Sequence, residues 1–181
     1  AELFSDSSVR KALSLVVDKS TMIAASLGPG YAPSNFSLDM GSFLYSDMLN
    51  VQANTDDAKQ ILLNDGWEYK NNYWSKIVEG KEKRLEFTII VNSNNDLRKA
   101  VANNLVDQFA NFGIPVKIQE ISGEKYSEIL SSKAYEVIIA GLECGYSPNV
   151  ETFFGDNNLA NYSNEEMSNL LIEVSNTTDE N

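Results

Sequence analysis

The run from Tyr135 to Ala140 constrains the fold more than any other stretch of the sequence. Its β-branched apolar interior is typical of a strand that is buried on both faces of a parallel or mixed sheet. We expect this strand to be central. Beyond it come residues that differ in side-chain chemistry, Gly141-Leu142-Glu143-Cys144-Gly145-Tyr146. Ligands of open α/β sheets bind beyond the carboxyl ends of strands, so these residues are candidate binding residues; the alternative is a strand that simply runs into a loop.

The preceding sequence predicts a strand, a helix and a strand in close succession. A β-branched run covers 85–91, and a stripe of Leu97, Val101, Leu105, Phe109 and Phe112 follows the capping residues 94–96. Alternation resumes over 114–121, and another helix begins near Ser122. This order predicts an α/β fold in which helices flank a mixed β-sheet.

Further helices are expected before and after this unit. Asp6 and Asp18 precede two helical stretches, and 55–57 can cap a third that ends at Gly66. A last helix should follow Asn164 and turn inward the apolar residues Met167, Leu170, Leu171 and Val174.

Aromatic residues mark a small β-hairpin between the third helix and the 85–91 strand. Trp67-Glu68-Tyr69 and Tyr73-Trp74-Ser75 flank the turn 70–72, and 79–83 reads as a solvated turn. The hairpin aromatics are expected to pack on the domain.

Length and charge limit the class of protein. The chain has 181 residues, enough for one compact domain, and we expect residues 1–181 to form a single α/β domain. A net charge of -12 disfavours binding to nucleic acid, which requires Lys and Arg against phosphates. No apolar run approaches the length of a membrane span.

The composition also removes several kinds of chemistry. The sequence has no histidine, so a Ser-His-Asp triad, a Cys-His dyad and His-dependent zinc sites are excluded. The acidic pairs Asp56-Asp57 and Glu165-Glu166 lie at helix starts, where the helix dipole explains them. Residues 156–158 lack the glycine and the terminal glutamate of a calcium loop, so no metal and no cofactor are expected.

Cys144 and Glu143 are the polar candidates that remain near the first strand. Cys144 is the only cysteine, and no histidine is present to activate it, so a small, partly buried filler is the favoured interpretation. Glu143 and Gly145 share one side of an extended strand, with Tyr146 beside them. A carboxylate, bare backbone and an aromatic ring suit recognition of a polar ligand.

Taken together, the order of motifs resembles the family 5 extracellular solute-binding proteins of ABC transporters, the oligopeptide-, dipeptide- and nickel-binding group. The stretches that carry the resemblance are 9–19, 58–67, 85–88, 108–116, Tyr126 with Leu130, 135–137 and 161–164. Their common order runs from about Val9 to about Val174.

The resemblance implies most of the carboxy-terminal lobe of a two-lobe protein with a type II periplasmic-binding-protein-like fold. The amino-terminal lobe and the final segment would lie outside this chain. It further implies an extracellular protein, periplasmic or held at the cell surface as a lipoprotein, whose partners are a small-molecule or peptide ligand and an ABC transporter membrane permease. Membrane association would come only through a lipid anchor outside the fragment.

The family often carries a Trp-x-x-Asp-Tyr-like pattern at the end of this strand, whose Asp meets a peptide's amino group. Here the pattern reads Leu142-Glu143-Cys144-Gly145-Tyr146, so only Tyr146 is kept. Either Glu143 supplies the carboxylate, or the ligand has no amino group; alternatively Glu143 is merely solvated. Ligand binding is thus predicted at Leu142 to Tyr146, near Asn92, and at Tyr31.

The function predicted on this basis is non-enzymatic capture of oligopeptides or another small polar solute for an importer, by closure of two lobes. Two other classes stay open. One is an interaction module that uses the aromatic hairpin, and the other is a Ser-Lys or two-carboxylate hydrolase domain.

Overall fold

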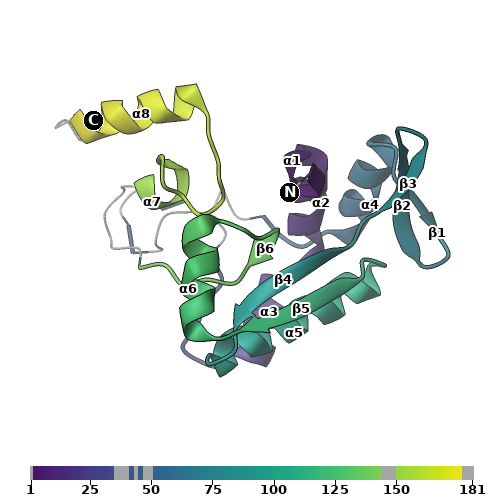
Figure 1. Cartoon of the computed structure of the whole chain (residues 1–181), viewed down its shortest axis with the longest axis horizontal. Helices are drawn as coiled ribbons and strands as arrows, with labels where there is room; N and C mark the ends of the chain where they lie inside the picture. The colour runs from purple at the N-terminus through teal and green to yellow at the C-terminus, as the bar shows by residue number, and fades with distance from the viewer. Residues whose placement is uncertain (1, 35–40, 43–44, 47–50, 144–149, 177–181) are drawn as a thin grey trace. The chain divides into compact units, whose positions relative to one another are not determined.

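The computed structural model describes residues 2–34, 41–42, 45–46, 51–143 and 150–176 (Figure 1). The chain divides into two compact units, one of residues 1–33 and 51–140 and the other of residues 34–50 and 141–181. The first unit contains, in chain order, α1 (Glu2–Ser5), α2 (Ser7–Val16), α3 (Lys19–Ser26), α4 (Thr55–Asn64), β1 (Glu68–Lys70), β2 (Tyr73–Val78), β3 (Lys81–Arg84), β4 (Phe87–Asn92), α5 (Asp96–Asn111), β5 (Val116–Ile121), α6 (Gly123–Ser132) and β6 (Val137–Ile138). The second contains α7 (Glu151–Phe154) and α8 (Glu165–Asn176).

Strands β5, β4 and β6 form a parallel sheet in that order. Ile89 of β4 lies opposite Ile118 of β5 and Val137 of β6. The predicted βαβ unit is therefore confirmed as β4-α5-β5, and the α/β class is confirmed with it. The expectation that the 135–140 strand is central is wrong for the described residues, because β4 occupies the centre and β6 is a half-buried edge strand of two residues.

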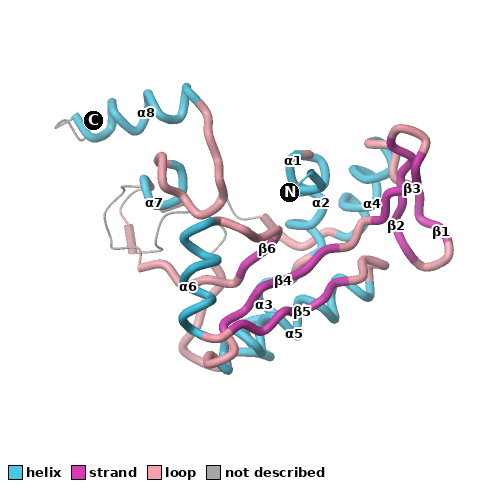
Figure 2. The backbone as a smooth tube through the Cα atoms, viewed as in Figure 1, coloured by secondary structure: helices cyan, strands magenta, loops and turns pink. Residues whose placement is uncertain are grey.

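The two faces of the parallel sheet are covered by different helices (Figures 1 and 2). Ile89 belongs to the larger apolar core, which includes residues of α2, α4 and α5. Its neighbour Ile90 belongs to a smaller cluster with Ile121 of β5 and Tyr126 of α6. Because successive side chains of a strand point to opposite faces, α5 and α6 cover opposite faces of the sheet.

Helices α2, α3 and α5 begin at caps that the sequence predicts. The side chains of Asp6, Asp18, Asn54 and Asn95 each accept a backbone N–H from the first turn of α2, α3, α4 and α5, respectively. Such caps satisfy donors that the helix itself leaves unpaired. For α4 the cap is Asn54 rather than one of the residues 55–57.

The predicted hairpin is part of a three-stranded antiparallel sheet, β1-β2-β3. The expectation that 79–83 is only a solvated turn is wrong, because Lys81–Arg84 pairs with β2 after a tight turn at Glu79 and Gly80, both of which have positive φ. The indoles of Trp67 and Trp74 are buried, at 3% and 2% exposure, as the packing interpretation requires. Tyr69 is half exposed.

In the second unit, the loop that follows α7 packs back on that helix. Phe154 of α7 packs edge to face against Tyr162, with ring centroids 5.6 Å apart. The prediction that Leu170 and Val174 of α8 face inward is wrong, since both are about half exposed and no residue of α8 is buried. The four-residue α7 packs against α8 but leaves these two side chains exposed.

Candidate ligand-binding site

The carboxyl ends of β4 and β5 form the geometrically favoured ligand position of the first unit. Asn92 lies opposite Ile121 in register, and α5 and α6 begin shortly after these two residues. The two helices then pass to opposite faces of the sheet (Figure 1). Open α/β sheets bind ligands beyond the carboxyl ends of their strands, which makes this edge a candidate position.

Asn92 organises the loop at this edge. Its side-chain Oδ1 accepts the backbone N–H of Asn94 over 2.9 Å, and its carbonyl oxygen accepts that of Asn95 over 3.2 Å. Asn95 in turn caps α5 by accepting the N–H of Arg98. The half-buried Asn92 thus fixes the polar turn 93–95 at the strand end, a structural role that the sequence did not reveal.

At the end of β6, the backbone of Ile139 is held from two sides. Its N–H donates to the carbonyl oxygen of Ile90 over 3.0 Å, and its carbonyl oxygen accepts the hydroxyl of Tyr126 over 2.7 Å. Tyr126 is only 5% exposed, and this burial raises the pKa of its hydroxyl. In the sequence Tyr126 was named among the residues that carry the family resemblance, and no local pattern indicated its partner, which lies 13 positions later.

Leu142 and Glu143 belong to the second unit, and both are exposed. Leu142 lines an open cavity of about 470 Å³, within the roughly 300–1,000 Å³ range of small-molecule sites. The cavity is lined by Leu142, Glu151, Thr152, Gly155, Asp156, Asn157 and Leu159. Its acidic and amide groups suit a ligand that carries hydrogen-bond donors. The sequence predicted Leu142 as a ligand-binding residue, but it did not predict the other lining residues, at 151–159.

Three other predicted residues, Cys144, Gly145 and Tyr146, lie outside the described residues. β6 ends at Ile138, so the described structure does not place Glu143 on an extended strand, contrary to the alternation expected from the sequence. Tyr31 follows the turn after α3 in the first unit and is 52% exposed. The structure therefore supplies Asn92 and Tyr31 from separate segments of one unit, and Leu142 and Glu143 from the other.

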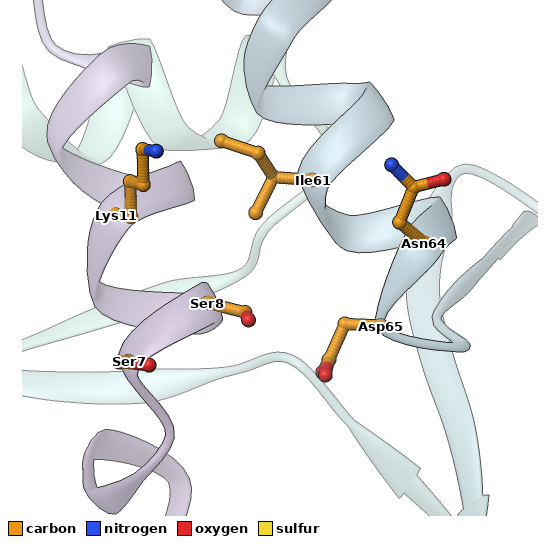
Figure 3. Close-up of a pocket in the computed structure, with 6 residues that line it drawn as sticks. All are labelled: Ser7, Ser8, Lys11, Ile61, Asn64 and Asp65. Atoms are coloured by element: carbon orange, nitrogen blue, oxygen red, sulfur yellow. The ribbon is translucent and has the colours of Figure 1, made fainter.

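A different hollow, of about 360 Å³, lies between α2 and α4 (Figure 3). Ser7, Ser8 and Lys11 line one side, and Ile61, Asn64 and Asp65 line the other. The Asp65 carboxylate already accepts the indole N–H of Trp67 and pairs with Lys76 at 3.0 Å. Those contacts lower the pKa of Asp65, with the hydrogen bond from Lys76 as the main cause. This hollow contains none of the predicted ligand residues.

Two further features of the described residues concern metal binding and membrane spans. Within those ranges, no cluster of three or more His, Cys, Asp or Glu side chains is arranged to hold a metal ion. None of the helices described is long and apolar enough to cross a membrane.

The parallel sheet with helices on both faces defines the class of fold, an α/β lobe. The family described as "Bacterial extracellular solute-binding proteins, family 5 Middle" matches residues 1–163. The chain belongs to this family. It is also similar to the curated oligopeptide-binding protein AppA of Bacillus subtilis (strain 168), with 25% identity over 195 residues, which cover 98% of this chain and 34% of the relative.

Solved structures share the fold. The AppA structure from Bacillus subtilis, in complex with a nonapeptide, matches 99% of this chain and 37% of that one, with a TM-score of 0.85 and 24% identity. NikZ from Campylobacter jejuni, in complex with Ni(L-His), matches 99% of this chain and 38% of that one, with a TM-score of 0.84 and 23% identity. The chain thus spans about a third of the length of these relatives.

Proposed function

We propose that this chain is part of the substrate-binding component of an ABC importer, which captures oligopeptides or another small polar solute by lobe closure. The observation that carries the proposal is the family match across residues 1–163. The chain would supply most of the carboxy-terminal lobe of a longer protein, and its ligand would be enclosed when a second lobe closes over it. Its partner in the membrane would be the importer's permease.

The proposed ligand contacts lie in residues that follow the parallel strands, and each unit is described by itself. In the first unit, the loop fixed by Asn92 would offer backbone and amide groups. In the second unit, Glu143 would offer a carboxylate to a ligand's amino group, and the cavity beside Leu142 would take a part of the ligand. A peptide is the first choice of solute because AppA carries one, and a metal chelate is the second because NikZ carries one.

We further propose that the solute is released unchanged and that the protein works outside the cytoplasm, anchored by lipid or free in a periplasm. The interaction-module alternative loses support because Trp67 and Trp74 are buried, which leaves the hairpin little aromatic surface. The hydrolase alternative gains no support from the described residues, where the acidic residues 56–57 and 165–166 lie in the first turns of α4 and α8.

The test is ligand capture by the full-length protein that carries this chain. The purified protein is incubated with a complex nutrient extract, washed and denatured, and the released compounds are identified by mass spectrometry. Recovered peptides would support the proposal, and a nickel chelate would support it with the second solute class. Recovery of no compound, at protein concentrations that saturate a control binding protein, would contradict it.

A further inference from the structure

The parallel ladder between β4 and β6 ends at a specific hydrogen bond. Residues pair as Ile89 with Val137 and Ile90 with Ile138, and the N–H of Ile139 still donates to Ile90. In a continued parallel ladder, the carbonyl oxygen of Ile139 would accept the N–H two residues beyond Ile90, which is that of Asn92. The pairing of β6 with β4 ends at Ile138, one residue before Ile139. The hydroxyl of Tyr126 donates to the Ile139 carbonyl oxygen instead.

We propose that Tyr126 is a positioning residue for ligand capture, which ends the β6 ladder at Ile139 and so fixes where the chain leaves the sheet toward Leu142 and Glu143. The inference rests on the proposed function only for its effect on ligand binding. Its effect on the backbone at Ile139 follows from the geometry alone.

The surroundings of Tyr126 make its hydroxyl a well-defined anchor. The residue lies in the second turn of α6, and its ring packs in the cluster that contains Ile90 and Ile121. A buried ring in a close-packed cluster has few alternative rotamers, so the hydroxyl stays aimed at one acceptor. The 2.7 Å distance to the Ile139 oxygen is that of a good O–H···O hydrogen bond.

The position of this bond in the chain gives it consequences for the site. Ile139 lies three residues before Leu142 and four before Glu143, which are two of the described residues predicted to bind ligand. Without the hydroxyl, the backbone of Ile139 would keep the hydrogen bond from its N–H to Ile90 but lose the one at its carbonyl oxygen. The segment 140–143 would then sample more conformations, and binding would have to order it at a cost in affinity.

Tyr126→Phe in the full-length protein tests the proposal, because it removes the hydroxyl and keeps the ring. Tyr73→Phe is the matched control: it removes a hydroxyl that donates to Glu82 on the antiparallel sheet. Hydrogen exchange of the peptide covering 137–143 is measured by mass spectrometry in both variants. Binding of a synthetic random pentapeptide library is measured by calorimetry.

We expect exchange across 137–143 to become about 5-fold faster in Tyr126→Phe, the change that loss of one typical hydrogen bond produces. We expect binding to the library to weaken by a similar factor and Tyr73→Phe to change neither. Unchanged exchange in Tyr126→Phe would overturn the proposal, as would faster exchange with unchanged binding. If the wild-type protein binds no pentapeptide, peptide capture fails, and the exchange measurement alone decides the role of Tyr126 at the strand end.

Discussion

The indole N–H of Trp74 donates a hydrogen bond to the carbonyl oxygen of Phe112 over 2.9 Å, and the two rings stack with centroids 5.6 Å apart. Trp74 belongs to β2, and Phe112 is the residue that ends α5. This contact joins the antiparallel sheet to the helix that lies between β4 and β5. The aromatic residues of the hairpin are therefore part of the core that supports the parallel sheet.

Replacement of Trp74 should be costly for that reason. We expect Trp74→Ala to lower the free energy of unfolding by about 3–5 kcal/mol and Trp74→Phe by about 2 kcal/mol, through lost contacts and an unpaired carbonyl. Urea unfolding followed by far-UV circular dichroism measures both. Ile77→Thr on the same strand, where Ile77 is 68% exposed, is the control and should stay within about 0.5 kcal/mol. Equal effects of Trp74→Phe and the control would contradict the packing role.

Gly113 turns the chain from α5 toward β5 and cannot accept a side chain. Its φ is +84°, and an added Cβ would lie against the Tyr69 ring and 3.2 Å from the Asn72 carbonyl oxygen. We expect Gly113→Ala to lower the free energy of unfolding by about 2–4 kcal/mol, because of left-handed backbone strain and a steric clash. Gly80→Ala separates the two causes, because Gly80 has φ +76° with nothing within 4 Å of its added Cβ.

The control should therefore cost only about 1 kcal/mol, the strain alone. The same urea titration compares the two alanine variants. Similar losses in both would show that the contact with Tyr69 and Asn72 is unimportant.

The Asp65 carboxylate should make the free energy of unfolding depend on pH in the acid range. Its folded-state pKa is lowered, first by the hydrogen bond from Lys76, so its stabilising contribution is complete above its unfolded pKa and disappears as pH falls through the folded one. We expect the wild-type protein to lose more stability than Asp65→Asn between pH 6 and pH values below about 4. Unfolding midpoints measured at each pH test this, and parallel curves for the two proteins would refute it.

Asn158 should be the residue on which the second unit depends most. It is 2% exposed; its Nδ2 donates to the carbonyl oxygens of Gly155 and Tyr162, and its Oδ1 accepts the N–H of Tyr162. We expect Asn158→Ala to lower the free energy of local unfolding of this segment by about 2–3 kcal/mol, because it leaves buried backbone groups unpaired. Hydrogen exchange across 151–162 should accelerate, whereas the neighbouring exposed Asn157→Ala should have little effect on exchange.

Local signals explain how much of the fold was predictable. The caps at Asp6, Asp18 and Asn95 and the apolar run of β4 act within a few residues, and all were recognised. The β3 strand was missed because Lys81–Arg84 has no apolar alternation, although the Gly80 turn was an available signal. The fold class followed from the order of the elements.

The candidate site was less predictable because it depends on contacts between distant residues. Leu142 was named from its position after a strand, but its cavity is formed with residues 151–159. The role of Tyr126 depends on the carbonyl oxygen of Ile139, and no local pattern indicates where a buried hydroxyl donates. The short β6 likewise reflects that bond rather than the apolar content of 135–140.

Glu143, the carboxylate proposed to meet the solute, offers the most direct test of ligand capture. The dissociation constant of the full-length protein for the solute recovered in the capture experiment is measured by calorimetry, for the wild type and for Glu143→Gln. Glu86→Gln, at an exposed position just before β4, is the matched control for loss of one charge. We expect about 10- to 100-fold weaker binding in Glu143→Gln, from the loss of a charged hydrogen bond, and no change in the control. Equal dissociation constants for Glu143→Gln and the wild type would contradict the proposed role of Glu143.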